Sequence, residues 1–184
     1  MSEQFLNTSK PSSTTPIPNP SDVDRGPPVR NLELSIEPGS VYLVLFNMGS
    51  IKNFHWSLVV ATTERTGMMY HNTNTSGAFK FDPYLHPHLL NSVTLLLALK
   101  FAEITSYDRE FHQYFANTLS KISTENRTCR PWALEAIYET ADLGLIKFAP
   151  SRSEISLLAT EAVLLVDADE SKTPKVLVSK YFAK

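Results

Sequence analysis

The sequence predicts an α+β fold in which an antiparallel β-sheet packs against helices. Two observations carry this prediction. Short runs rich in β-branched and aromatic residues come first, between residues 41 and 81. Segments with helical spacing or a high content of helix formers follow them towards the C-terminus. Strands followed by helices along one chain are typical of the α+β class.

The chain has 184 residues, a length that suits one domain. Residues 1–30 are rich in Pro, Ser, Thr and Asn, a mixture that buries too little apolar surface to offset the entropy of ordering. We therefore expect a disordered tail over 1–30 and one catalytic domain over 31–184. The alternative for the tail is a polyproline segment that binds a partner or covers the site.

Four strands are expected in the first half of the domain. They are residues 41–46, 54–60, 68–71 and, shorter, 78–81. In the second of these strands the two-residue period places Trp56 on one face and His55 on the other. The turn at 62–67 joins it to the third strand, so the two form a hairpin. This hairpin can bring His55 and His71 to one side of the sheet.

Helices are expected over residues 88–100, 107–119, 129–143 and 151–167, with an edge strand over 175–182. The first helix is predicted from a dense run of Leu. In the third, apolar or small residues recur at helical spacing from Cys129 to Ile137, and Gly144 ends the pattern. The fourth opens with Ser151 and Glu154, which are spaced as in a capping box.

The one cysteine of the chain, Cys129, is the candidate nucleophile. Pro131 follows it closely, and proline is tolerated only in the first turn of a helix, so the thiol falls at the positive end of the helix dipole. Such a position favours the thiolate, which is the reactive form of cysteine. The alternative interpretation is a small core residue, because free cysteines are very often buried.

Two histidines are candidates to act with this thiol. His55 lies on a strand that can face the start of the helix, where an imidazole accepts a thiol proton and later returns it. His71, on the neighbouring strand, is placed to bond the first imidazole and fix its tautomer. The alternatives are structural: a half-buried histidine bonded to a backbone carbonyl for His55, and a solvated strand end for His71.

Three strings in this order resemble the permuted papain-like thiol enzymes: His55-Trp-Ser-Leu-Val-Val60, Gly67-Met-Met-Tyr-His71, and Thr128-Cys129 at a helix start. That superfamily includes lecithin retinol acyltransferase and the NlpC-type cell-wall peptidases. The resemblance spans residues 41 to 145 and implies a permuted papain-like, NlpC-type architecture. It makes Cys129 the nucleophile, His55 the general base and His71 the orienting residue. The His-Trp and Cys-Arg-x-Trp signatures also resemble a fungal branch to which no substrate is assigned.

The implied activity is a cysteine-dependent acyl transferase or hydrolase that acts on a thioester, an ester or an amide. Candidate substrate-binding residues are Trp56, Asn72, Asn74 and Trp132. Thr128 stands where the acyltransferases usually have Asn, and the C-terminal tail is Lys-rich, so a membrane phospholipid is not the expected substrate. Two rivals stay open: a small-molecule-binding protein without turnover, and a biosynthetic cyclase or isomerase that uses the same dyad.

The composition excludes some classes of partner and indicates a cellular compartment. Lys and Arg total 17 against 19 Asp and Glu, and no basic run alternates with aromatics, so no nucleic acid is expected. The apolar runs are too short for a membrane anchor, no secretory signal is apparent, and the single cysteine fits a reducing, cytoplasmic location. Neither a cofactor nor a metal is expected, because His86 and His88 lack further ligands at a recognisable spacing. The oligomeric state is not predicted.

Overall fold

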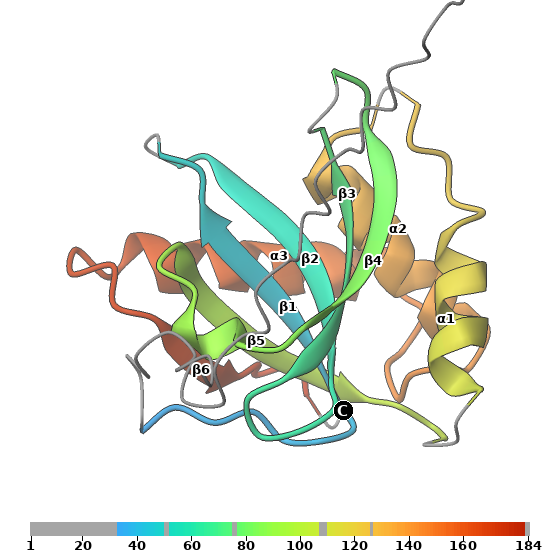
Figure 1. Cartoon of the computed structure of the whole chain (residues 1–184), viewed down its shortest axis with the longest axis horizontal. Coiled ribbons are helices and arrows are strands. Elements are labelled where there is room, and N and C mark those ends of the chain that lie inside the picture. The colour runs from blue at the N-terminus through green and yellow to red at the C-terminus, as the bar shows by residue number, and fades with distance from the viewer. Residues whose placement is uncertain (1–32, 50–51, 75–76, 107–109, 126, 183–184) are drawn as a thin grey trace, which may run out of the picture.

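The computed structural model describes residues 33–182 apart from 50–51, 75–76, 107–109 and 126. One six-stranded sheet, in the order β4-β3-β2-β1-β5-β6, packs against three α-helices (Figure 1). The predicted α+β class is therefore confirmed. The sheet is mixed rather than wholly antiparallel, because β6 pairs with β5 in parallel. The tail predicted over 1–30 lies outside the described residues.

The strands are β1 (Ser40–Asn47), β2 (Phe54–Ala61), β3 (Gly67–Thr73), β4 (Lys80–His86), β5 (Leu95–Glu103) and β6 (Lys175–Val178). The helices are a 3-10 turn η1 (Leu89–Asn91), α1 (Phe111–Leu119), α2 (Cys129–Asp142) and α3 (Arg152–Asp167). Most predicted elements correspond to these. The fourth strand begins and ends later than expected, and the start of the helix predicted at 107–119 falls partly outside the described residues.

The helix predicted over 88–100 is wrong. This stretch forms η1 and then β5, which lies between β1 and β6 in the sheet. Leu95, Leu97 and Leu99 are at most 1% exposed. A strand that is covered on both faces carries an unbroken apolar run, and periodicity alone cannot distinguish such a run from a buried helix. The small helix preference of Leu is outweighed by the roughly 1.5–3 kcal/mol that full burial of its side chain contributes.

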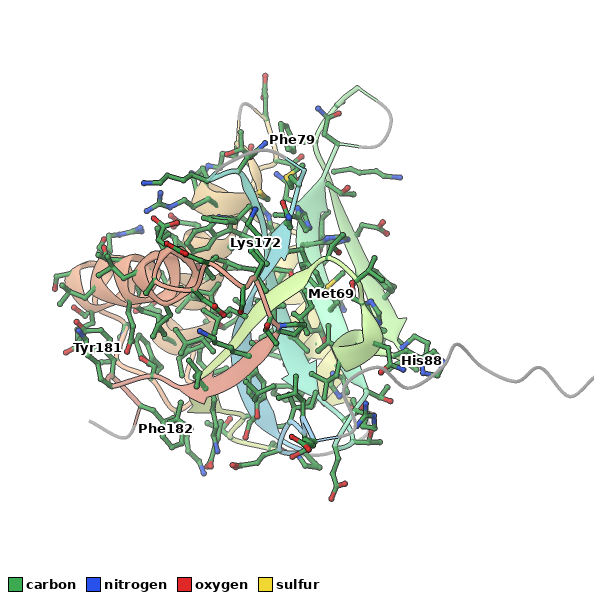
Figure 2. The ribbon with its side chains drawn as sticks, turned by 90° about the vertical axis from the view of Figure 1, so that its left-hand side faces the viewer. Met69, Phe79, His88, Lys172, Tyr181 and Phe182 are labelled. Carbon is green, nitrogen blue, oxygen red and sulfur yellow. The ribbon has the colours of Figure 1, made fainter. Side chains whose placement is uncertain are left out.

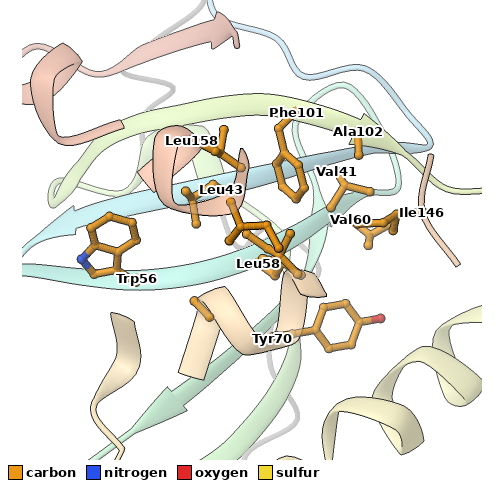
Figure 3. Packing of buried hydrophobic residues seen from close by; sticks show 14 of the residues in the cluster. Val41, Leu43, Trp56, Leu58, Val60, Tyr70, Phe101, Ala102, Ile146 and Leu158 are labelled. Atoms are coloured by element: carbon orange, nitrogen blue, oxygen red, sulfur yellow. The ribbon is translucent and has the colours of Figure 1, made fainter. Parts of the chain in front are cut away.

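The larger part of the core lies between the sheet and the helices. Side chains on one face of β1, β2 and β5, among them Leu43, Leu58 and Phe101, pack against Leu158 of α3 (Figure 3). Trp132 of α2 belongs to the same cluster and is completely buried. Because strands alternate between faces, Trp56 points into this helix-side core while His55, the residue before it, points to the opposite face.

A smaller apolar cluster covers the face of the sheet opposite the helices. It includes Tyr42, Val59 and Met69 of the sheet together with Leu89 and Leu90 of η1. Figure 2 shows Met69 on the side of the sheet away from α3. The short turn η1 thus packs on this face and covers part of it with two leucines.

The helix boundaries follow the local sequence signals. At the start of α3, Oγ of Ser151 accepts a hydrogen bond from the backbone N–H of Glu154 at 3.3 Å, one half of the predicted capping box. After α2, Gly144 takes a φ of +66°, the left-handed conformation that glycine adopts readily and that ends helices. Among the described residues, no helix has both the length and the apolar composition needed to cross a membrane.

At Gly67, the first residue of β3, the backbone lies close to Val59 and Val60 of β2. A Cβ atom at this position would lie 2.4 Å from Cγ1 of Val59 and 3.1 Å from the carbonyl oxygen of Val60. Val59 is fully buried and has little freedom to move. We therefore expect Gly67→Ala to lower the free energy of unfolding, measured in urea, by about 1–3 kcal/mol.

The Gly67 prediction has an internal control. Val59→Ala removes the atom that the new methyl group would meet, so the double variant should be more stable than the two single changes predict by addition. Strictly additive losses would show that the close approach at Gly67 is not the cause.

Candidate functional site

The start of β2 and the end of β3 separate from each other. Their pairing ends at Ser57 and His71, whereas β2 continues to pair with β1 back to Phe54, and β3 continues to pair with β4 up to Thr73. A fork therefore opens between residues 54–56 of β2 and 72–73 of β3. Figure 1 shows these two strands diverging, with α2 lying behind the gap.

The start of α2 is bonded to both sides of this fork. On the β3 side, Nδ2 of Asn72 donates to the carbonyl oxygen of Arg127 at 2.6 Å. On the β2 side, the thiol of Cys129 donates to the carbonyl oxygen of Phe54, with Sγ and oxygen 3.7 Å apart. Asn72 is fully buried, so water does not compete for its bond. These two bonds hold Cys129 beside the residue that precedes His55.

The imidazoles of His55 and His71 are bonded to each other. Nε2 of His55 lies 2.6 Å from Nδ1 of His71, and one of these two nitrogens must carry the shared hydrogen. On β4, Asp82 stands opposite His71, and its Oδ2 lies 4.0 Å from Nε2 of His71, too far for a hydrogen bond. The row Asp82–His71–His55 thus ends at Nδ1 of His55, which takes no part in the bond with His71.

Both imidazoles are uncharged near neutral pH. Burial, reinforced by the nearby imidazole of His55, lowers the pKa of His71 to about 4, although Asp82 acts in the other direction. Burial also lowers the pKa of His55. A neutral imidazole can accept a proton, whereas an imidazolium cannot. The pair therefore has a base available at the pH at which most enzymes act.

The two histidines line a cavity of about 320 Å³ on the face of the sheet opposite the helices. Cys129 does not line this cavity, and in the described part of the chain its thiol has no hydrogen bond to either imidazole. The structure therefore brings His55 and His71 into contact. It leaves Cys129 on the helix side of the fork, against the backbone of Phe54.

The four residues predicted to contact substrate lie elsewhere. Trp56 and Trp132 are 3% and 0% exposed in the helix-side core, where the guanidinium of Arg130 covers the ring of Trp56 at 5.0 Å. Asn72 is the buried anchor of the segment before α2, and Asn74 is exposed in the loop after β3. None of the four lines the cavity around the histidines.

Three residues of β4 near the site were not predicted to belong to it: Asp82, Tyr84 and His86, the last of which was considered only as a metal ligand. They share a face of the strand, since they are two residues apart, and the last two line the cavity. Their alternation is visible in the sequence, but the strand was expected to end at residue 81, before all three of these residues. Within the described residues, no group of three or more His, Cys, Asp or Glu side chains is arranged to hold a metal ion.

Comparisons with known proteins identify no relative of this chain. No protein-family model matches the chain, and neither a curated protein nor a solved structure does. The resemblance to the permuted papain-like enzymes therefore stays a prediction. The features that bear on its function are the fork between β2 and β3, the paired imidazoles and the cavity that they line.

The lowered pKa of His71 predicts how stability depends on pH. The folded pKa of about 4 lies below the ordinary value of 6.5, so the unfolded chain binds this proton more tightly than the folded chain does. Stability from this group is complete above about pH 6.5 and is lost as the pH falls through about 4, by on the order of 3 kcal/mol. Urea unfolding at a series of pH values measures it.

Two variants test whether His71 causes this dependence of the free energy of unfolding on pH. His71→Asn should remove this part of the pH dependence, because asparagine does not titrate. Tyr114→Ala, at an exposed position of α1, should keep the slope of the unchanged protein. A full slope in His71→Asn would mean that another group is responsible.

Proposed function

We propose that this protein is a cysteine-dependent acyl transferase or hydrolase of the permuted papain-like type, with Cys129 as nucleophile and His55 as base. The observation that carries the proposal is the bond between Cys129 and the carbonyl of Phe54, because it holds the thiol, at the first residue of a helix, against the residue that precedes His55. A thiol at a helix start, a neighbouring imidazole and a third group that orients the imidazole form a recurrent pattern of nucleophilic catalysis.

In this proposal His71 determines which nitrogen of His55 is the base. With Nε2 of His55 bonded to His71, Nδ1 is left to accept the proton of Cys129. The thiol and the imidazole start from opposite faces of the sheet, but the fork is the region where β2 and β3 are not paired. The proposal requires that rotation about the Cα–Cβ bond of Cys129 releases Sγ from the Phe54 carbonyl and brings it to this opening.

The proposed reaction has two halves. First, Nδ1 of His55 takes the thiol proton, and Sγ attacks the acyl carbon of the substrate. The backbone N–H groups of Cys129 and Arg130 stabilise the oxyanion, because N–H groups in the first turn of a helix have no partner within the helix. The bond to the leaving group then breaks, the leaving group takes the proton from His55, and a thioester remains on Cys129.

In the second half an acceptor removes the acyl group. Water, an amine or an alcohol gives its proton to His55 and attacks the thioester carbon. The carbon–sulfur bond breaks, Sγ takes the proton back, and the acid or the acylated acceptor leaves. Attack by water makes the protein a hydrolase, and attack by an amine or alcohol makes it a transferase.

A binding protein without turnover is the second candidate. The observation that favours it is that the thiol bonds to a backbone carbonyl and lies outside the cavity that the histidines line. In this case Cys129 is a half-buried residue at a helix start, and the cavity alone carries the function.

Alkylation of Cys129 separates the two candidates. If His55 acts as its base, iodoacetamide should modify the thiol near neutral pH, and His55→Ala should slow the rate by about tenfold or more. Intact mass measures the rate without ambiguity, because the chain has only one cysteine. His112→Ala is the matched control, since this histidine bonds Tyr70 from α1. Equal rates in the unchanged protein and His55→Ala would favour the binding protein.

Turnover of an activated ester, p-nitrophenyl acetate, tests the division of roles. We expect His55→Ala to abolish turnover and His71→Asn to retain a measurable part, because an amide can orient an imidazole but cannot act as a base. Acetylation should add mass to Cys129 and should be absent or far slower in Cys129→Ser, since a hydroxyl is the weaker nucleophile. Equal losses from His55→Ala and His71→Asn would mean that the two roles are wrongly assigned.

A further inference from the structure

A continuous row of rings crosses four strands on the face opposite the helices. It runs from Phe46 of β1 through His55 and His71 to Tyr84 and His86 of β4. The centroids of neighbouring rings are 4.8 to 6.3 Å apart. The strand register creates the row, since Phe46 is directly opposite His55 in the β1–β2 pairing. All five rings line the cavity of about 320 Å³.

The wall of this cavity is polar in places but uncharged. Among the described residues that line it there is no Asp, Glu, Lys or Arg. Burial lowers the pKa of His86 as it does that of His71, so these rings are neutral near pH 7. Asp82 does not line the cavity, although its Oδ2 lies 4.0 Å from Nε2 of His71. A charged ligand would lose hydration here without gaining a partner of opposite charge.

Two ring nitrogens in the wall are buried and have no hydrogen-bond partner in the described structure: Nε2 of His71 and Nδ1 of His86. The residue His71 is only 7% exposed. Buried polar atoms in proteins are nearly always paired, so these two indicate a ligand that supplies the missing partners. An amide has both a carbonyl acceptor and N–H donors, and it can therefore pair with an imidazole nitrogen in either tautomer.

We propose that this cavity binds an uncharged aromatic amide, and that the acyl group handled at Cys129 is accordingly small, aromatic and neutral. The aromatic ring of the ligand packs along the row at Tyr84, and the amide group meets the unpaired nitrogens of His71 and His86. The volume lies at the lower end of the range for ligand pockets, which suits one ring with its carbonyl group rather than a long acyl chain. The acyl chemistry rests on the proposed function, whereas the binding does not.

Three probes of one shape and different charge test the inference: benzamide, benzoate and benzamidinium. The imidazole carbon–proton signals of the five histidines are followed by NMR near pH 7.5. Benzamide should shift the signals of His55, His71 and His86 to saturation and leave that of His112, which lies on α1. The two charged probes should bind about fivefold or more weakly. Equal binding of benzoate and benzamide, or no saturable shift with any probe, overturns the inference.

A pair of tyrosine variants locates the probe. Tyr84→Ala should weaken benzamide binding by about fivefold, because one ring of the row is lost. Tyr114→Ala, at an exposed position of α1, is the matched control and should leave binding unchanged. Equal weakening by both variants would place the probe elsewhere and contradict the proposed site.

Titration of Cys129→Ser alongside the unchanged protein separates this inference from the proposed function. Selective benzamide binding by a protein whose Cys129 does not react contradicts the acyl chemistry and supports the cavity's ligand class. A reactive Cys129 combined with no preference for benzamide supports the proposed function and overturns the ligand class.

Discussion

The end of the pairing between β2 and β3 at Ser57 and His71 is the constraint on which the candidate site depends. Protein interiors are close-packed, so a gap between two diverging strands has to be filled. The segment that leads into α2 fills it from the helix side, with Arg127 bonded to Asn72 and Cys129 bonded to Phe54. The two hydrogen bonds that join the start of α2 to β2 and β3 therefore also fix the position of Cys129. A shift of either strand would move the thiol.

Two buried polar atoms near the fork have no hydrogen-bond partner in the described structure. Oδ1 of Asn72 and Nε1 of Trp132 are buried without a partner in the described structure, and Phe81, which is opposite Asn72 on β4, packs on the Trp132 ring. Each such atom costs about 1–3 kcal/mol relative to a paired one. Natural proteins tolerate such departures mainly where a site requires them. The side chain of Asn72 pairs through its Nδ2 with the carbonyl oxygen of Arg127, while its Oδ1 stays unpaired in the described structure.

The sequence predicted the elements whose signals act over a few residues and not those that depend on contacts distant in the chain. β1 to β3, α2 and α3 were predicted because alternation, Pro131 and the cap at Ser151 act within a few residues. β5 was predicted as a helix because burial from both faces removes alternation, and burial depends on the whole fold. The pairing of His55 with His71 depends on one hairpin. The contribution of Tyr84 and the distance of Cys129 from the cavity depend on register and on the fork, which no local pattern encodes.

Pro83 in the middle of β4 affects what kind of molecule can approach the aromatic row. It lies opposite Tyr70 on β3, and β4 is the outermost strand on this side of the sheet. Because proline has no N–H, a polypeptide laid alongside β4 cannot form a regular ladder of hydrogen bonds with it. Recognition by β-augmentation, in which a bound peptide extends a sheet by one strand, is therefore disfavoured at this edge. Ligands at this edge are therefore expected to be compact molecules that bind without pairing with the backbone of β4.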